Sequence, residues 1–463
     1  MGEARRGGGR AADRGARRAR PGEALSTRQL LLGILLFAAL LRFPGLDYPR
    51  AEYFDEVYHA KTALQYLNGE SPTEWVHPPT AKLLIAVPVH LFGYKPWAWR
   101  LAPALAGTLL AGVFFLLARL VLPTERAALL ATGLLLFDGV YLVQSRVAMT
   151  NVFAVLFQLL SALLVVRAAG ARRLDTRAML GVGLALGLAL STRWTSLWAW
   201  GFLGLVFVAT RRARRREPAE DIDAPPLGPL WREAALLAVG FFVLPALVYL
   251  LSYVPWMAQA HPQSAADWWK RVVDTVKWQK DIWDYHAHLT AGHTYYSRWY
   301  TWPFLYRPTW YFWESGRGVI HGIVALGNPA IWWASVPASA WALVSGIRWR
   351  QPRLVFVGAG FFFLYLPWGI SPRTLNFSHY LFEAIPYACL SLGVLLDREW
   401  DSPRRPAAVL YVALAAALFV LFLPLLTGLG VPERLWALRF PAVKVLGVQI
   451  GGGGLWTWFP SWI

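Results

Sequence analysis

The sequence predicts an all-α polytopic membrane protein, and two observations support this fold class. First, 56% of the 463 residues are hydrophobic, and the mean hydropathy is +0.39. Second, the apolar residues come in long blocks, such as 127–137 and 234–251, which are typical of membrane spans and not of amphipathic core helices. Eleven transmembrane helices are expected, near residues 29–45, 98–118, 127–144, 150–167, 178–192, 194–210, 232–253, 329–347, 353–369, 379–397 and 406–427.

The distribution of charge predicts the orientation of the chain. The formal net charge is +18, but the basic runs after the first span occupy short connections between apolar blocks, as cytoplasmic loops do. The N-terminus is therefore expected in the cytoplasm and the C-terminus outside, and nucleic-acid binding is not expected. Residues 1–28 are rich in Arg, Gly and Ala and are predicted to be a disordered cytoplasmic tail. They lack the features of a cleaved secretory signal, so the first span is expected to be retained.

The block 178–210 leaves two topologies open. It is too long for a single span of about 20 residues, and Ser191, Thr192 and Arg193 interrupt it. A tight hairpin of two spans keeps every later basic connection inside. A single span reduces the count to ten and moves those connections outside. The hairpin is the preferred prediction.

The eleven-span topology divides the chain into modules. An N-terminal transmembrane module, 29–253, contains a first outer loop at 46–97, and a second outer loop rich in Trp, Tyr and His covers 254–328. A four-span module follows at 329–428, and 429–463 forms an outer tail. All nine histidines then lie outside or at the outer rim, so we expect the outer face to be the working face.

The first outer loop combines two adjacent acidic residues with a short helix. Asp55 can cap a helix that ends at Gly69. On a helix, Asp55 and Glu56 point about 100° apart, so they cannot form the opposed acid and base of a glycosidase. A transferase with a phosphate leaving group needs only one base, because the phosphate leaves as an anion. The alternative is structural, with Asp55 as a helix cap and Glu56 as a partner of the helix dipole.

Cations at the outer ends of the spans are candidates for binding a phosphate. An arginine there either extends to lipid headgroups or binds a phosphate in a fixed fork. Asp138 and Glu383 lie within predicted spans, and each is expected to pair with an inward-facing cation. The cationic candidates are Arg42, Arg146, Arg193, Arg373, His379 and Lys82.

The histidines are expected to form hydrogen bonds and not to bind a metal. The motif His77-Pro78-Pro79 forces an extended kink that holds its imidazole in one place. The single cysteine, Cys389, lies in an apolar block, so it has no partner for a disulfide or a thiolate metal site. Three histidines of the second loop lack the i, i+4 pairing of a helical zinc site: His286, His288 and His293.

Through the acidic, cationic and histidine motifs described above, the chain resembles the protein O-mannosyltransferases, which are membrane glycosyltransferases of the GT-C class. The resemblance covers most of the chain, and its specificity comes from the order and spacing of many short motifs. The matching motifs are Leu41-Arg42-Phe43, Phe54-Asp55-Glu56-Val57-Tyr58, Ala60-Lys61, His77-Pro78-Pro79-Thr80-Ala81-Lys82, Trp99-Arg100-Leu101-Ala102-Pro103, Gln144-Ser145-Arg146, Ser191-Thr192-Arg193-Trp194, Tyr285-His286, Leu289-Thr290, His293, Tyr295, Ser297, Trp302-Pro303, Arg307-Pro308, Arg373-Thr374 and Ser378-His379-Tyr380-Leu381.

The resemblance implies a reaction and its partners. The donor would be polyprenyl-phosphate mannose, and the acceptors would be Ser or Thr hydroxyls of secreted or membrane proteins. Transfer would occur with inversion at the outer face of the plasma membrane, without a cofactor. The lipid bilayer and the protein translocation machinery are further expected partners.

The resemblance also implies roles for individual residues. Asp55 would be the general base, and Glu56 would bind the acceptor or order the loop. Arg146 would face the donor phosphate. The other donor-binding candidates are Arg193, Arg373, His379 and Lys82, and the residues expected to organise the loop or the acceptor are Tyr58, His77, Pro78, Pro79 and His293.

Three departures from the family pattern limit this transfer of roles. Asn151 stands where the family usually has an aspartate, and Arg193 stands where a lysine is frequent. The second outer loop, 254–328, is too short for the sugar-binding-like insertion of the eukaryotic members. The chain therefore resembles the compact bacterial type.

Two alternative functions stay open. Another GT-C enzyme, which adds aminoarabinose or another sugar to a lipid or glycan, would share the acidic first loop. The His-Pro-Pro motif and the second-loop motifs favour protein mannosylation over it. A transporter is disfavoured because the chain shows no internal repeats and concentrates its polar residues on one face, not at mid-membrane.

Overall fold

Helices dominate the computed structural model, which describes residues 25–216, 227–445, 448–450 and 452–462. The predicted tail, 1–28, lies almost entirely outside these residues. The helices are α1 (Thr27–Arg42), α2 (Glu56–Asn68), α3 (Thr80–Phe92), α4 (Pro96–Val121), α5 (Glu125–Leu136), α6 (Gly139–Gln144), α7 (Asn151–Gly170), α8 (Thr176–Leu190), α9 (Ser196–Arg216), α10 (Leu230–Ala238), η1 (Val239–Val243), α11 (Leu244–Ser252), α12 (Val254–Ala258), α13 (Ala265–His288), η2 (Trp299–Phe304), α14 (Pro329–Arg348), α15 (Pro352–Tyr365), η3 (Leu366–Gly369), η4 (Ser378–Glu383), α16 (Ile385–Trp400), α17 (Arg405–Thr427), α18 (Glu433–Trp436) and η5 (Pro460–Trp462).

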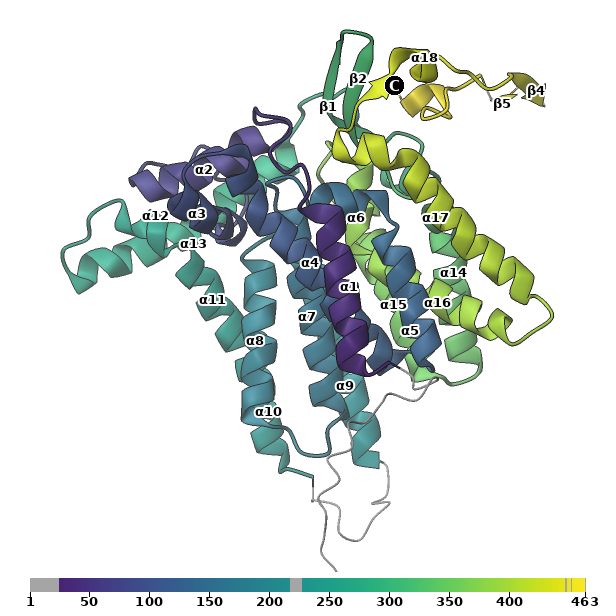
Figure 1. Cartoon of the computed structure of the whole chain (residues 1–463). Helices are drawn as coiled ribbons and strands as arrows, with labels where there is room; N and C mark the ends of the chain where they lie inside the picture. The colour runs from purple at the N-terminus through teal and green to yellow at the C-terminus, as the bar shows by residue number, and fades with distance from the viewer. Residues whose placement is uncertain (1–24, 217–226, 446–447, 451, 463) are drawn as a thin grey trace, which may run out of the picture.

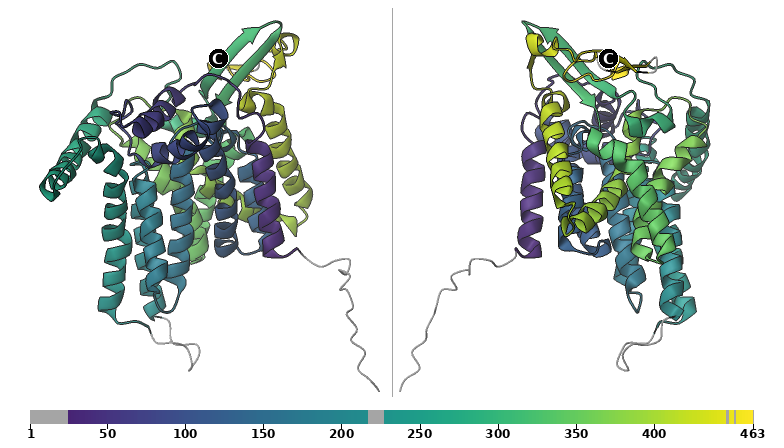
Figure 2. Two further views of the ribbon diagram at one scale, coloured as in Figure 1. Left: turned by 60° about the vertical axis from the view of Figure 1, so that its left-hand side comes forward. Right: turned by 90° about the vertical axis from the view of Figure 1, so that its right-hand side faces the viewer.

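The long apolar helices form a bundle whose elements run along one common direction (Figures 1 and 2). Each predicted span contains a helix. Within the described residues, six helical segments are long and apolar enough to cross a membrane, so the protein is a multi-pass membrane protein. The crossing of the other five and the sides reached by the termini stay predictions. The six segments are Pro96–Val121, Asn151–Gly170, Leu230–Ser252, Pro329–Arg348, Pro352–Gly369 and Arg405–Thr427.

The block 178–210 folds as two helices, α8 and α9, with a break at Ser191–Thr195. Gln158 of α7 donates to the Ser196 hydroxyl at the start of α9 (3.0 Å). Near its other end α9 places Arg211 against the carbonyl of Ala169 (3.4 Å). Helices α7 and α9 therefore run in the same direction, and α8, which connects them along the chain, runs in the opposite direction. This arrangement agrees with the hairpin of the eleven-span prediction.

The first loop forms the helices α2 and α3 at one end of the bundle (Figure 1). Helix α2 has Asp55 at its N-cap position and ends at Gly69, whose φ of 70° is left-handed and suits a residue without a Cβ. Helix α3 runs through Pro88 to Phe92. At its start, the Thr80 hydroxyl donates to Ser191 Oγ (2.7 Å), which ties the first loop to the tip of the α8–α9 hairpin.

The second loop corrects the all-α expectation, because it contains an antiparallel hairpin in addition to helices α12 and α13. Strand β1 (Thr309–Gly316) pairs with β2 (Val319–Ala325) from Thr309↔Ala325 to Gly316↔Val319. The turn residues Arg317 and Gly318 both have positive φ, as tight two-residue hairpins require. The remaining strands are short: β3 (Val431–Pro432) pairs with β2, and β4 (Val443–Val445) pairs with β5 (Val448–Ile450).

The two acidic residues inside predicted spans differ in their partners. Glu383 lies 3.6 Å from Arg193, so its expected pairing with a cation is confirmed. The same expectation is wrong for Asp138. Its carboxylate accepts from the Trp332 indole (2.7 Å) and from the backbone N–H of Tyr141 (2.8 Å), so neutral donors solvate the buried carboxylate and join α6 to α14.

Candidate active site

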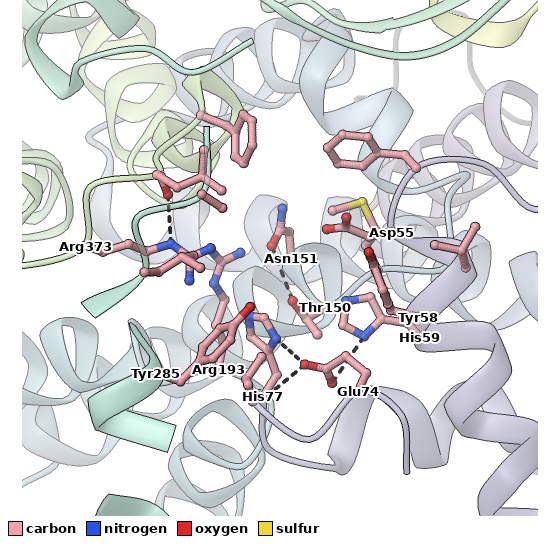
Figure 3. A pocket seen from close by; sticks show the side chains of 18 of the residues that line it. Asp55, Tyr58, His59, Glu74, His77, Thr150, Asn151, Arg193, Tyr285 and Arg373 are labelled. Atoms are coloured by element: carbon pink, nitrogen blue, oxygen red, sulfur yellow. Dashed lines mark hydrogen bonds and ion pairs between the residues drawn. The ribbon is translucent and has the colours of Figure 1, made fainter. Parts of the chain in front are cut away.

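A cavity of about 510 Å³ lies where the first loop, the α8–α9 hairpin and the second loop meet. Asp55 and His59 lie across it from Arg193 and Arg373 (Figure 3). It is lined by Phe54, Asp55, Val57, Tyr58, His59, Thr73, Glu74, Trp75, Val76, His77, Met149, Thr150, Asn151, Arg193, Tyr285, Leu289, Ala291, His293, Arg373, Leu375, Phe377 and Tyr380.

Asp55 is half-buried at the wall of this cavity. It occupies the N-cap position of α2 without a side-chain capping bond, and no described residue donates a hydrogen bond to its carboxylate. The residue before it, Phe54, has a φ of 50° and stacks on Tyr311 with ring centroids 4.0 Å apart, which anchors the start of α2. The alternative in which the Asp55 side chain caps the helix therefore does not explain the position of this carboxylate.

The surroundings of Asp55 raise its pKa to about 6. Burial is the largest cause, and the negative charge of Glu74 adds to it. The positive charges of Arg373 and Arg193 oppose the rise. A carboxyl with this pKa is ionised at neutral pH and is still a better proton acceptor than an ordinary aspartate.

Glu56 has a different environment, although it is adjacent in sequence. It is fully buried and does not line the cavity. Its carboxylate accepts from Arg100 through Nε (2.8 Å) and Nη2 (2.7 Å), and it also accepts from the backbone N–H of Ala148 (3.1 Å). Of the two roles that the sequence left open for Glu56, ordering the loop fits this geometry and binding an acceptor does not.

Glu74 is a carboxylate of the site that sequence reasoning missed. It is buried, pairs with Lys82, and accepts from His77 Nδ1 (2.7 Å). His59 Nδ1 lies 3.7 Å away. Burial opposes ionisation, but the charge of Lys82 and the hydrogen bond from His77 hold the pKa of Glu74 well below its usual range. Its position three residues before His77 was the available signal, because side chains at that spacing meet in a turn.

Two arginines line the other side of the cavity. The Arg193 guanidinium lies over the Tyr380 ring, 4.6 Å from its centroid, and near Glu383. Arg373 donates from Nε to the Leu375 carbonyl (2.8 Å), and its Nη1 donates to His286 Nδ1 (2.5 Å). Within the described residues the Arg373 Nη2 donates no hydrogen bond, which leaves it for a ligand.

His286 connects Arg373 to the first loop. Its Nε2 lies 2.9 Å from the carbonyl oxygen of Val76. A carbonyl only accepts, so Nε2 carries the proton and Nδ1 presents a lone pair to Arg373. Burial and the charge of Arg373 lower the pKa of His286 to about 4, which keeps this neutral tautomer at pH 7.

A second cavity, of about 170 Å³, shares His77, Arg193 and Arg373 with the first. The two arginines therefore stand at the junction of a polar cavity and a largely aromatic one. The remaining residues that line the second cavity are Trp194, Thr195, Leu197, Trp198, Trp283, His286, Ala287, Trp368, Ser371 and Pro372.

Three expected donor-binding residues do not line either of these cavities. Lys82 is buried, pairs with Glu74 and donates to the His77 carbonyl (2.7 Å). His379 is buried and contacts the Thr309 hydroxyl (3.3 Å). Arg146 lines a separate cavity, where its Nη1 donates to carbonyls at the end of α1. Their residue types were visible in the sequence, but the directions of their side chains depend on tertiary packing.

The residues expected to organise the loop or the acceptor lie at the main cavity or next to it. Tyr58, His77 and His293 line the main cavity, and the buried Pro78 and Pro79 lead into α3, with Pro79 at its N-cap. The cavity floor also includes Thr150 and Asn151 (Figure 3). Within the described residues, no group of three or more His, Cys, Asp or Glu side chains is arranged to hold a metal ion.

Solved structures show the fold that the chain shares. The fold matches the Saccharomyces cerevisiae protein O-mannosyltransferase Pmt1-Pmt2 complex bound to its sugar donor, with a TM-score of 0.73 at 15% identity, over 88% of this chain and 91% of that chain. It also matches ArnT from Cupriavidus metallidurans bound to undecaprenyl phosphate, with a TM-score of 0.53 at 18% identity, over 86% and 71%. The fold is that of the GT-C membrane glycosyltransferases.

The sequence then defines the family. The chain matches the family described as dolichyl-phosphate-mannose-protein mannosyltransferase over 33–99 and 95–258, and the C-terminal four-transmembrane region of protein-O-mannosyltransferase over 272–439. The chain belongs to this family and is a glycosyltransferase, as the motifs predicted. Polyprenol-phosphate-mannose–protein mannosyltransferases of Mycolicibacterium smegmatis and Mycobacterium tuberculosis are 28% and 27% identical over 93% of this chain, and the matches cover 92% and 90% of those proteins.

Proposed function

We propose that the chain transfers mannose from polyprenyl-phosphate mannose to Ser or Thr hydroxyls of secreted or membrane proteins, with Asp55 as the general base. One observation carries the proposal: the Asp55 carboxylate, without a hydrogen-bond donor among the described residues, lines the same cavity as Arg193 and Arg373. The names of the bacterial relatives support the donor and acceptor classes.

In the proposed reaction, Asp55 takes the proton of the acceptor hydroxyl while the hydroxyl oxygen attacks the anomeric carbon of mannose. The bond between that carbon and the phosphate oxygen breaks on the opposite face, which inverts the configuration. The phosphate leaves as an anion and needs no proton, because Arg193 and Arg373 stabilise its charge through charge-assisted hydrogen bonds. One base and no acid are sufficient.

The cavity junction suggests how the donor binds. Its phosphate would lie between Arg193 and Arg373, its sugar would extend toward Asp55, and its prenyl chain would enter the aromatic cavity. Trp and apolar walls suit an isoprenoid chain. His286 orients Arg373, so it acts on the donor phosphate as a positioning residue.

The proposal places the reaction at the outer face of the plasma membrane. Arg193 lies in the cavity just before α9, and the same helix ends in Arg214, Arg215 and Arg216. A helix of this length spans about 30 Å, so its basic end lies on the far side of the bilayer. Basic ends are preferentially cytoplasmic. Secreted polypeptides, arriving from the translocation machinery, would then meet the cavity from outside.

The proposal is tested by incubating the purified protein with defined prenyl-phosphate sugars and a Ser/Thr peptide. The expected product is a peptide heavier by one hexose, formed from the mannosyl donor and with inverted anomeric configuration. Transfer of another sugar in preference to mannose, or retention of configuration, would contradict it.

A further inference from the structure

A third cavity, of about 410 Å³, has no role in the proposed reaction and shares no lining residue with the other two described above. It lies between the C-terminal ends of α1 and α17, at the end of the bundle that carries β2 (Figure 1). Its lining residues are Leu40, Leu41, Pro44, Gly45, Tyr48, Arg146, His321, Leu423, Thr427, Gly428, Leu429 and Gly430. None of them is acidic.

Arg146 brings a buried positive charge to this cavity. Its side chain is 6% exposed, and it donates to the carbonyls of Arg42 (2.6 Å), Pro44 (2.7 Å) and Gly45 (3.2 Å). A guanidinium has five N–H groups, so two are left without an acceptor among the described residues. No described carboxylate forms an ion pair with it, and burial together with Arg100 and Arg42 lowers its pKa to about 10.

Apolar tracks on two helices lead to the cavity. On α1, the exposed residues Leu32, Leu36 and Leu40 recur every four positions, and Leu40 lines the cavity. On α17, the exposed Val420 leads through Leu423 to Thr427, and both of the latter line the cavity. Residues at these spacings share one helix face. Both helices coincide with predicted spans, and α17 is one of the six segments long and apolar enough to cross a membrane, so we expect both tracks to face lipid.

We infer that this cavity binds the phosphate headgroup of an anionic membrane phospholipid, with Arg146 on the phosphate and an acyl chain along the two apolar tracks. A buried cation without a carboxylate partner needs an anion. Because the cavity walls continue into the lipid-facing helices α1 and α17, the bilayer is the source of that anion. Turns at Gly45 and Gly428, both with positive φ, keep side chains out of the space. The inference is independent of the proposed transfer reaction.

The test uses the purified full-length protein in neutral detergent. Native mass spectrometry and thermal unfolding measure the binding of phosphatidylglycerol, of diacylglycerol with the same chains, and of inorganic phosphate. Phosphatidylglycerol is expected to bind and stabilise the protein, and each of the other two to bind at least about tenfold more weakly, because each lacks one half of the interaction. Binding of diacylglycerol or of inorganic phosphate as tight as that of phosphatidylglycerol would overturn the assignment.

Two matched variants connect the binding to this cavity. Leu423→Trp fills it without removing the cation and should weaken phosphatidylglycerol binding about tenfold, whereas Leu410→Trp, on an exposed part of the same helix, should not. Equal binding in both variants would overturn the inference. Arg146→Gln should also weaken binding, but it removes carbonyl contacts of α1, so the tryptophan pair decides. Sugar transfer in lipid-free detergent should persist in Leu423→Trp, which separates this site from the proposed reaction.

Discussion

Asp55 and Glu56 are adjacent and chemically similar, yet their surroundings assign them different roles. Arg100 and the Ala148 N–H engage the Glu56 carboxylate, and Asp55 faces a cavity without such donors. The loop therefore uses one carboxylate for structure and presents the other to a ligand. Because burial raises the pKa of Asp55, the rate of transfer should depend on pH in a specific way.

As the pH is lowered through about 6, the rate of transfer is expected to fall. Above about pH 6, ionisation of Asp55 should no longer limit the rate. The base must be ionised to accept a proton, and its pKa is about 6, so the active fraction increases as pH rises through that value. The measurement is kcat/KM against pH with purified protein and a short peptide. Glu74→Gln removes a charge that raises this pKa, so it should move the acid limb to lower pH. An acid limb at the same pH in the Glu74→Gln protein would show that the charge of Glu74 does not raise the pKa of Asp55.

His286 is expected to affect the donor and not the acceptor. Replacement by Phe removes the lone pair that orients Arg373, and loss of a charge-assisted hydrogen bond should raise the donor KM about tenfold. His286→Asn keeps an acceptor near the Nδ1 position and should be affected less. His288→Phe, on the exposed face of the same helix, is the control. An unchanged donor KM in His286→Phe would remove the positioning role.

The sequence supported prediction of some site residues and not of others. Asp55, Arg193 and Arg373 lie at recognisable motifs, and the structure brings them to one cavity. Glu74 follows no periodic pattern, and its importance arises because Lys82 of α3 turns back onto it. Arg146 carries the same charge as Arg193, but carbonyls at the end of α1 hold it in another cavity. Composition cannot distinguish these outcomes.

At the scale of elements, a buried ion pair joins α2 to α4. Arg100 and Glu56 are both fully buried, and Arg100 also donates to the carbonyls of Leu46 (3.0 Å) and Pro49 (2.7 Å). The pair therefore holds the chain that enters α2, and with it the position of Asp55.

Glu56→Gln is expected to destabilise the protein strongly. Removing one partner of a buried pair leaves an uncompensated charge, at a cost of about 3–5 kcal/mol. Thermal unfolding in detergent should show a clear fall in the transition temperature. Lys280→Gln breaks the exposed Lys280–Asp284 pair and should leave that temperature unchanged. Equal effects of the two substitutions would contradict the structural role of Glu56.

Element boundaries were largely predictable where local chemistry decides them. Helix α2 lies between Asp55 and Gly69 as expected, and the Ser191–Thr195 break separates α8 from α9. The β1–β2 hairpin was missed, because the second outer loop was predicted only as a loop rich in Trp, Tyr and His. The tight turn at Arg317-Gly318 was the overlooked signal.

For the whole molecule, the account requires the cavity and the basic helix ends to lie on opposite sides of the membrane. The single Cys389 is buried, so engineered cysteines can report the topology. Ala266→Cys, at the exposed start of α13, should react with a membrane-impermeant maleimide in intact cells. Arg173→Cys, between α7 and α8, should react only after the membrane is opened. The reverse pattern would invert the orientation and exclude transfer at the outer face.

The most direct measurement of the central claim is sugar transfer by the Asp55→Asn protein. Asparagine has nearly the same shape and cannot accept the proton, so the variant should fold, keep its unfolding temperature and bind the donor. Its transfer of mannose from the polyprenyl-phosphate donor to a Ser/Thr peptide should fall by about 100-fold or more. Transfer at the wild-type rate by a correctly folded Asp55→Asn protein would contradict the assignment of Asp55 as the base.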